Sequence, residues 1–363
     1  MEVKTSAIQN STEAITPLHS LQAGTWFKLI CGASYQALPA IRNLALAYAL
    51  AGVDCIDVAA DPAVMAAAKE GLDAAEKVAH QEDRAFNRPW LMVSMSAGED
   101  PHFRKAWFDA SVCPADCPRP CELICPADAI DADGVVRDRC YGCGRCLPVC
   151  PLGLIEARAQ PTSLDAIAQR VLTQADALEI HTQVGHYSEF KALWQAIQSQ
   201  ASHLKLISVS CPDGEGLIDY LSSLRNILKH FTAQNYGVSA GKVPTVVWQT
   251  DGRPMSGDIG KGTTHATIRL AQKVLASGLS NYVQLAGGTN QHTVPKLQAL
   301  GLLNRSQEKE TKTGQMVSGI AYGSYARHLL APVIEQTLYL EEVSPALWEA
   351  VALAESLVKP LKN

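Results

Sequence analysis

Residues 27–60 read FKLICGASYQALPAIRNLALAYALAGVDCIDVAA, and this stretch contains the repeating unit of the fold. Two short apolar runs, FKLICG from Phe27 and CIDVAA from Cys55, enclose a longer amphipathic segment. Continuous apolar runs separated by a single helix are typical of parallel strands that are buried on both faces. The stretch therefore predicts one β–α–β unit.

The same alternation continues along the rest of the chain. Further apolar runs are WLMVSMS from Trp90, LEIHT from Leu178, LISVSC from Leu206, TVVWQT from Thr245, YVQLAGG from Tyr282 and GIAYGS from Gly319. Eight β–α units are the number found in a closed (β/α)8 barrel, and we predict this α/β fold. The alternative is an open doubly wound sheet, which one miscounted strand would favour.

Composition narrows the class of protein. The chain has 363 residues, is 47% hydrophobic and carries a formal net charge of −5. A net negative charge does not indicate a basic surface for binding nucleic acid. No apolar run is long enough for a membrane-spanning helix. The first twenty residues are polar and contain no apolar signal-peptide core. We therefore expect a soluble cytoplasmic protein that is not integral to a membrane.

Eight of the eleven cysteines lie between Cys113 and Cys150. The segment CYGCGRCLPVCP, residues 140–151, spaces four of them by two, two and three residues and ends in proline. This spacing is typical of a [4Fe–4S] ligand loop whose last cysteine serves a second cluster. Zinc or unligated thiols are the alternatives.

A partner motif, CPADCPRPCELICP, begins at Cys113, and a hairpin signal at Asp133–Gly134 separates it from the second motif. We interpret the two as a two-cluster ferredoxin-like module that exchanges ligands between its motifs. One cluster uses Cys125, Cys140, Cys143 and Cys146, and the other uses Cys113, Cys117, Cys121 and Cys150. Three residues instead of two separate the first cysteines, so a [3Fe–4S] cluster or an empty site is the alternative there.

The domain organisation follows from these two patterns. We expect a flexible arm over 1–24, the first part of the barrel over 25–110, the module over 111–156 and the remainder of the barrel with C-terminal helices over 157–363. The module would then be inserted after the third strand, where active-site loops emerge.

Glycines follow the last two predicted strands. Gly287 and Gly288, then Gly323 and Ser324, would bring backbone N–H groups to a phosphate, and Arg327 would add a charge. The alternative is that these residues form ordinary βα turns.

Other polar residues lie where the barrel mouth is expected. The segment after the sixth strand contains Asp251, Arg253, Ser256 and Lys261, and we interpret it as a loop over the mouth or a solvated surface loop. His181 ends the fourth strand, where it faces the mouth or makes a structural hydrogen bond. No residue stands out as catalytic.

Four segments together resemble the cyanobacterial light-dependent period protein A family. They are KLICGASYQ, GVDCIDVAADP, the cysteine region from Cys113 to Pro151 and WQTDGRPMSGDIGKGTTHATIRLA. The resemblance implies an iron–sulfur protein that feeds redox state, as a measure of light, into the circadian clock. It also implies partners such as the circadian input histidine kinase, and a functional link to the plastoquinone pool.

Three functions remain open at this point. The resemblance favours a redox sensor, which is an electron-transfer protein rather than a substrate-converting enzyme. The second is an oxidoreductase whose barrel binds a flavin or a phospholigand, with the clusters as electron relay. The third is a scaffold in which the clusters are structural.

Overall fold

The computed structural model describes residues 16–363, except 33–36, 99–103, 126, 138, 141, 143, 160–169, 236–243, 254–261, 280–281 and 304–315. Eight parallel strands form a closed barrel, since the last strand pairs with the first. The strands are β1 Trp26–Ile30, β2 Cys55–Ala59, β3 Trp90–Ser96, β8 Ala177–His181, β9 Leu206–Pro212, β10 Thr245–Asp251, β11 Val283–Ala286 and β12 Gly319–Tyr322. The predicted barrel is confirmed, and closure excludes the open sheet.

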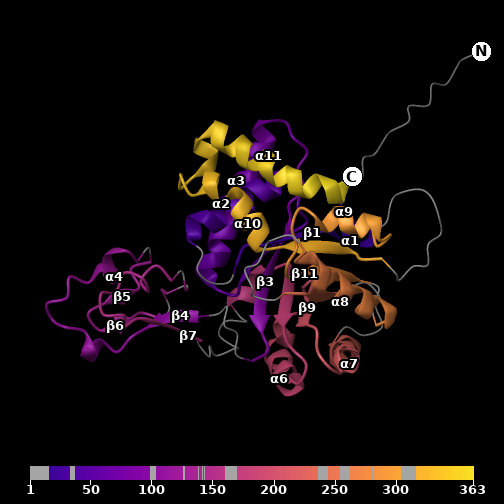
Figure 1. Ribbon diagram of the computed structural model, residues 1–363, viewed down its shortest axis with the longest axis horizontal. Coiled ribbons are helices and arrows are strands. Elements are labelled where there is room, and N and C mark those ends of the chain that lie inside the picture. The colour runs from indigo at the N-terminus through magenta and orange to yellow at the C-terminus, as the bar shows by residue number, and fades with distance from the viewer. Residues whose placement is uncertain are drawn as a thin grey trace, which may run out of the picture.

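Helices surround the barrel (Figure 1). They are α1 Pro17–Ala23, α2 Leu38–Leu50, α3 Pro62–Gln81, α6 Tyr187–Ile197, α7 Leu217–Asn235, α8 Thr264–Ala276, α9 Thr293–Ala299, α10 Ser324–Ile334 and α11 Ser344–Lys362. Short 3-10 turns are η1 Ala110–Val112, η2 Leu172–Gln174, η3 Gln198–Gln200 and η4 Leu340–Glu342. Within the described residues, no helix is both long enough and apolar enough to cross a membrane.

Local sequence explains where α3 begins and how closely it packs. The side chain of Asp61 caps the helix by accepting hydrogen bonds from Ala63 N and Val64 N, and Pro62 occupies the first turn. Gly71 faces α2 so closely that a Cβ atom would lie 2.2 Å from the carbonyl oxygen of Arg42. The missing side chain therefore sets the distance between α2 and α3.

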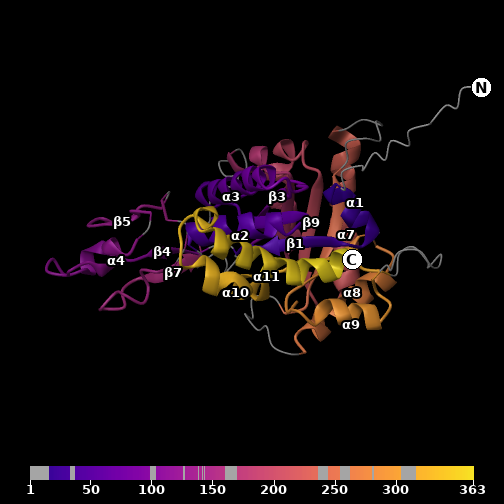
Figure 2. The ribbon, with the colours of Figure 1, turned by 90° about the horizontal axis from the view of Figure 1, so that it is seen from above.

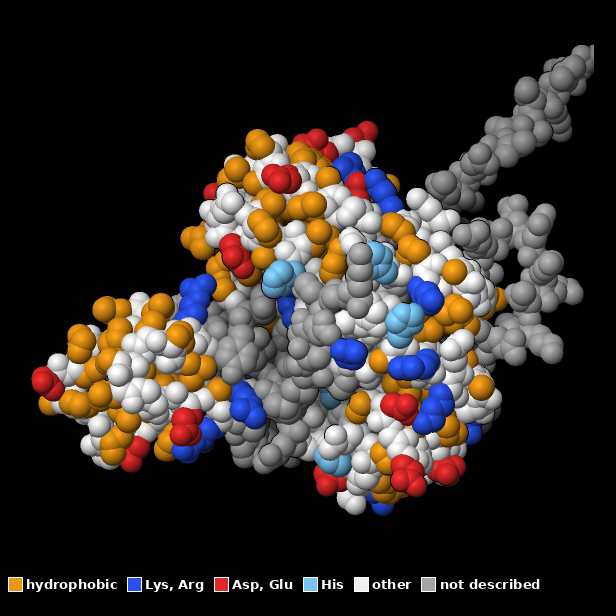
Figure 3. All heavy atoms as spheres, in the orientation of Figure 1, with side chains coloured by type: hydrophobic (Ala, Val, Ile, Leu, Met, Phe, Trp, Pro, Cys, Tyr) orange, Lys and Arg blue, Asp and Glu red, His pale blue; other side chains and the backbone are white. Residues whose placement is uncertain are grey.

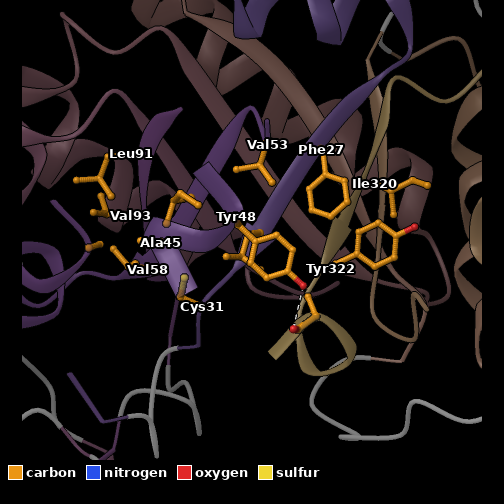
Figure 4. Close-up of a cluster of buried hydrophobic side chains, with 14 of the residues drawn as sticks. Phe27, Cys31, Ala45, Tyr48, Val53, Val58, Leu91, Val93, Ile320 and Tyr322 are labelled. Atoms are coloured by element: carbon orange, nitrogen blue, oxygen red, sulfur yellow. Dashed lines mark hydrogen bonds between the residues drawn. The ribbon is translucent and has the colours of Figure 1, made fainter. Parts of the chain in front are cut away.

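The main core lies between the strands and the surrounding helices (Figure 4). Phe27 of β1 stacks on Tyr322 of β12, with ring centroids 4.8 Å apart. The hydroxyl of Tyr48, on α2, donates to the carbonyl oxygen of Ala326 at 2.9 Å. Aromatic packing and this hydrogen bond thus join the first and last elements of the barrel.

A second apolar cluster fills the N-terminal half of the barrel interior. It contains the first residues of several strands and one helix residue: Leu21, Trp26, Cys55, Trp90, Met92, Ala177, Leu206 and Val247. Helix α1 contributes Leu21 to this cluster, and Thr16 and His19 form a capping box at its start. This helix occupies part of the stretch expected as an arm, while residues 1–15 lie outside the described residues.

The cysteine region is inserted between β3 and β8, after the third barrel strand as predicted. Strands β4 Arg104–Trp107 and β7 Glu156–Ala159 pair as an antiparallel ribbon at its base. Beyond the ribbon lie helix α4 Pro120–Leu123 and the hairpin of β5 Ile130–Asp131 with β6 Gly134–Val135. Both ribbon views show this module projecting to one side of the barrel (Figures 1 and 2).

Candidate metal centre

The cysteine module has a small interior that is partly built of its own cysteines. Four more cysteines, Cys113, Cys125, Cys140 and Cys150, pack against this interior. Its buried side chains are Ala106, Phe108, Cys121, Ile130, Cys146 and Ile155. An apolar core of this size stabilises a fold only weakly, so the module needs additional bonds.

The structure brings Cys150 to the cysteines of the first motif. Burial raises the pKa of the Cys113 thiol, and the neighbouring Cys117 and Cys150 raise it further. Cys150 also contributes to the raised pKa of Cys121, for which burial is the largest cause. Three of these cysteines share one small core, in which Cys121 is buried and against which Cys113 and Cys150 pack. The group consists of the four cysteines that the sequence interpretation assigns to one cluster.

Backbone N–H groups surround the sulfur of Cys150. The amide of Leu154 donates to Sγ at 3.3 Å, and the amides of Leu152, Gly153 and Ile155 face the same atom. Burial opposes ionisation of this thiol, but the N–H groups outweigh burial and lower its pKa. The thiolate is the form that binds metal, so this loop prepares Cys150 as a ligand.

The second ligand group is described in three of its four members. Cys146 is buried in the module core, and Cys125 and Cys140 pack against the same core. The amide of Ala129 donates to Sγ of Cys125 at 3.3 Å. Cys143 lies outside the described residues. Contacts with the shared core therefore gather the three described cysteines of this group in one part of the module.

Two glycines shape the loop of the second motif. Gly142 and Gly144 have φ values of 79° and 72°, in the left-handed region that favours glycine. They allow the chain to turn sharply between Cys140 and Cys146.

The module offers the donors that an iron–sulfur cluster requires. The described cysteines form no disulfide bonds with one another, and those of the module other than Cys117 belong to its small apolar core or pack against it. Backbone N–H groups donate to sulfur in both ligand groups, and such hydrogen bonds tune iron–sulfur sites. The residues present therefore fit the group in their chemistry.

The glycines predicted near a phosphate lie at the C-terminal end of β11. Gly287 and Gly288 have φ values of 66° and 93°. A Cβ atom on Gly287 would lie 2.8 Å from Arg253 N, and one on Gly288 would lie 2.7 Å from Thr263 O. Both glycines thus allow the loop after β11 to pack against the loop after β10.

The other three predicted residues lie at the start of α10. Gly323 is the N-cap of this helix and Ser324 is its first residue. Arg327 donates to the carbonyl oxygen of Ile30 at 2.9 Å and to Oγ of Ser324 at 3.2 Å. The guanidinium therefore joins α10 to the end of β1. Ser256 and Lys261, predicted in the neighbouring loop, lie outside the described residues.

Sequence reasoning missed a group of charged side chains inside the barrel. Lys28 and Glu179 are fully buried, and Asp57 is 2% exposed. Nζ of Lys28 lies 3.2 Å from Oδ2 of Asp57 and contacts the carboxylate of Glu179. The sequence did contain a sign of this group, because each of three otherwise apolar strands includes one charged residue.

His181 and Asp251, which the sequence placed near the mouth, belong to the same group. Nε2 of His181 lies 3.4 Å from Oε1 of Glu179. Asp251 is 9% exposed, and its carboxylate accepts hydrogen bonds from Ser210 and Gln249. We define the barrel-mouth network as Lys28, Asp57, Glu179, His181 and Asp251.

Comparison with known proteins gives two family matches and one close relative. The light dependent period A C-terminal domain matches residues 171–360, and the LdpA Fe-S cluster-binding domain matches residues 113–161. The chain is 54% identical to Light dependent period A of Synechococcus elongatus over 352 residues. The alignment covers 96% of this chain and 94% of that protein.

Solved structures with a similar overall shape are distant in sequence. A tryptophan synthase structure from Mycobacterium tuberculosis has a TM-score of 0.43 and 11% identity, covering 96% of this chain and 97% of that chain. Tryptophan synthase subunit alpha from Legionella pneumophila has a TM-score of 0.43 and 10% identity, with the same coverage. The strand pairing described above, rather than these likenesses, defines the barrel.

Proposed function

The chain belongs to the light dependent period A family, and on this premise we propose that it is a redox sensor of the circadian clock. Its Fe-S cluster-binding domain makes it an iron–sulfur protein. The proposed sensor reports light-dependent changes of cellular redox state from the cytoplasm. The observation that carries the proposal is the projecting module, in which cysteines of both motifs share one small core.

We propose that the module holds two [4Fe–4S] clusters, with the ligand groups assigned above. A [3Fe–4S] cluster is the alternative at Cys113, Cys117, Cys121 and Cys150. Such clusters, when bound, supply one-electron oxidation and reduction. The chain itself stabilises thiolates through the N–H groups around Cys150. Arg119 adds positive charge beside Cys113 and lowers the pKa of that thiol against the effect of burial.

The module also offers a surface for a partner. Leu123 is 86% exposed, Val112 is 56% exposed and Leu152 is 55% exposed. Val112 adjoins Cys113, and the other two lie two positions from Cys125 and Cys150 respectively. Figure 3 shows hydrophobic side chains spread over this projecting part of the molecule. Exposed apolar patches mark interaction sites, so we assign this one to a clock-input partner such as the circadian input histidine kinase.

A sensor requires two states that its partner distinguishes. We propose that electron flow through the plastoquinone pool sets the redox state, and that the partner binds one state more tightly. The placement of exposed apolar residues next to ligand cysteines supports a direct effect of redox state on docking.

Iron and acid-labile sulfide analysis of anaerobically purified protein tests the cluster assignment. Two clusters correspond to about eight irons per chain. Cys150→Ser should lose about half of this iron, whereas Cys211→Ser, at a buried position on β9, should lose none. Four irons in the natural protein, unchanged in Cys150→Ser, would show that the first ligand group is vestigial.

Partner capture at reducing and oxidising potentials tests the sensor. The clock-input kinase should bind one state several-fold more tightly, and Leu123→Asp should abolish binding. Leu338→Asp is the matched control, because Leu338 is 64% exposed and lies outside the module. Equal capture of both redox states would contradict the sensor and leave structural clusters as the better account.

The second candidate is an oxidoreductase whose barrel binds a flavin or a phospholigand at Gly287, Gly288, Gly323, Ser324 and Arg327. Buried ionisable side chains at the barrel mouth support chemistry at that end, because enzymes of this fold place their chemistry at the C-terminal ends of the strands. Their excess of carboxylates does not itself attract a phosphate, so Arg327 would have to supply the positive charge. Denaturation of the anaerobic protein should then release a flavin with resolved absorption bands. A supernatant without these bands counts against a flavin.

A further inference from the structure

The two ends of the barrel interior differ in chemistry. The N-terminal half is filled by the apolar cluster around Trp26 and Met92, as barrel interiors usually are. The C-terminal half contains the barrel-mouth network, whose members come from β1, β2, β8 and β10. Burying charges is costly, and clustered ionisable groups at strand ends are typical of functional sites.

Lys28 is a fixed positive charge at the base of this network. Its ammonium group contacts the carboxylates of Asp57 and Glu179 and also approaches Sδ of Met92 at 3.7 Å. Burial lowers the pKa of Lys28, but the two carboxylates outweigh burial and raise it above its ordinary value. Lys28 therefore remains protonated, and it neutralises one of the three carboxylates in the network.

Asp251 has hydrogen bonds but no cation in contact. Its carboxylate accepts from Oγ of Ser210 and, at 3.3 Å, from Nε2 of Gln249. Among the described residues, no lysine or arginine forms an ion pair with it. Burial raises the pKa of Asp251, and the positive charges of His181 and Lys28 only partly offset this effect. The thiol of Cys211 lies on the next strand, and burial raises its pKa to about 12, so it remains neutral.

Asp57, on the opposite side of the network, also has a raised pKa. Burial is the largest cause of its raised pKa of about 6, and the charge of Glu179 adds to it. Lys28 and the 2.6 Å hydrogen bond from Ser94 only partly offset these effects. The three carboxylates thus share one lysine within the described residues.

His181 connects the network to solvent. Its side chain is 31% exposed, whereas Glu179, with which it makes contact, is fully buried. Its positive charge, when protonated, would favour ionisation of Asp57, Glu179 and Asp251. A molecule entering from solvent would meet His181 first and Asp251 beside it.

We propose that the barrel mouth binds a small organic molecule through a primary ammonium group, which lies between Asp251 and His181. The ammonium supplies the missing positive charge and donates hydrogen bonds to carboxylate and imidazole. A metal ion fits less well, because the ammonium group of Lys28 already contacts the carboxylates of Asp57 and Glu179, two of the oxygen donors that a metal ion would need. This binding site is independent of the cluster module and of the proposed sensor.

The proposal fixes the direction of the pH dependence. An ammonium group competes with protons for Asp251 and Asp57. Its affinity should therefore rise as the pH increases through about 6 and then level off, because burial raises the pKa of Asp57 to about 6 and also raises the pKa of Asp251, so that both carboxyl groups lose their protons later than usual.

Nuclear magnetic resonance on the full anaerobic protein, with labelled histidine side chains, tests binding. The probes are n-butylammonium, 1-butanol and butyrate, which share one carbon chain and differ in charge. n-Butylammonium should shift the His181 signal, with an affinity at least about tenfold above that of 1-butanol. Butyrate should bind most weakly.

Two variants complete the test. Asp251→Asn keeps the oxygen that accepts from Gln249 and replaces the other oxygen by an NH2 group that can donate to Oγ of Ser210. It should weaken n-butylammonium binding about tenfold. Asp213→Asn, at an exposed position after the neighbouring strand β9, should leave binding unchanged. Equal responses to n-butylammonium and 1-butanol, or no response at about 100 mM, would overturn the proposal. Should Asp251→Asn not fold, a pH-independent affinity of the natural protein would overturn it equally.

Discussion

The barrel buries a large set of apolar side chains between its strands and helices, whereas the described part of the cysteine module buries seven, two of which are cysteines. The barrel therefore has enough apolar burial to fold by the hydrophobic effect. The module does not, and its thiolates must be held by metal. The same chain thus contains one unit stabilised by packing and one stabilised by ligands.

The surroundings of the ionisable side chains also differ between the module and the barrel. In the module, backbone N–H groups lower the pKa of the Cys150 thiol, and Arg119 opposes the effect of burial on the pKa of Cys113. The barrel places carboxylates deep inside, where Lys28 is their only contacting lysine or arginine within the described residues. Changes in the module should therefore alter metal content, and changes in the barrel mouth should alter stability and pH dependence.

Metal removal should have the largest effect and should separate the two regions. Chelation of the anaerobic protein should unfold residues around 110–155 and leave the barrel folded. Structural zinc in zinc-finger peptides contributes about 10–16 kcal/mol, and a metal contribution of even part of this size exceeds what a core this small can replace. Hydrogen exchange measured by mass spectrometry reports both regions in one sample, with peptides from β2 and β3 as the internal reference. Loss of protection in those peptides would show that the two units fold together.

Removing the buried cation should give the next largest effect. Lys28→Met leaves Asp57 and Glu179 without a cation in contact and should lower the free energy of unfolding by about 3–5 kcal/mol. Denaturant titration followed by tryptophan fluorescence measures the barrel, because Trp26, Trp194 and Trp248 are buried in it.

The matched control for this substitution is Lys273→Met. Lys273 pairs with Asp213 at 2.7 Å on the surface, where the loss should stay within about 1 kcal/mol. The iron content of both variants should equal that of the natural protein. A cost for Lys28→Met no larger than that for Lys273→Met would contradict the assigned role of the buried pair.

The pH dependence of barrel stability should show a smaller effect. Burial raises the pKa of Asp57 to about 6, so the folded state holds this proton more tightly than the unfolded state. The contribution of Asp57 is fully present at low pH and falls as the pH rises from about 4 to about 6, by up to about 3 kcal/mol. Asp57→Asn should flatten this decline in denaturant titrations, whereas Asp213→Asn should keep the natural slope. Identical slopes in all three proteins would refute the assignment.

The smallest expected effect concerns one methyl group in the barrel. Alanine is a better helix former than glycine by about 1 kcal/mol, so Gly71→Ala would stabilise an isolated helix. Here the added Cβ would lie 2.2 Å from the carbonyl oxygen of Arg42, and we expect a net loss of about 1–2 kcal/mol. Ala66→Gly, on the exposed face of the same helix, is the control, because it measures the difference in helix propensity between alanine and glycine without a change in packing. A gain in stability for Gly71→Ala would show that α2 and α3 can separate without cost.

The sequence by itself determined the units of this protein. Each apolar run predicted as a strand corresponds to a barrel strand, because strands buried on both faces must be apolar along their length. The spacing of the cysteines predicted the inserted module for a local reason, since consecutive ligands lie on one short loop. The hairpin of β5 and β6 lies at the Asp133–Gly134 signal. Helix α1 was not predicted, because its short sequence resembles a flexible arm. In the structure, its residue Leu21 packs into the apolar cluster at the N-terminal end of the barrel.

Only the tertiary structure decided which distant residues meet. Closure depends on pairing of β12 with β1, and Cys150 reaches Cys113 and Cys121 through the fold of the module. The barrel-mouth network is the clearest case. Lys28, Glu179 and Asp251 are far apart in the chain, and each alone is one polar residue within or at the end of an apolar strand. Their meeting follows from the register of eight strands around one axis, and long-range register is not encoded in local sequence.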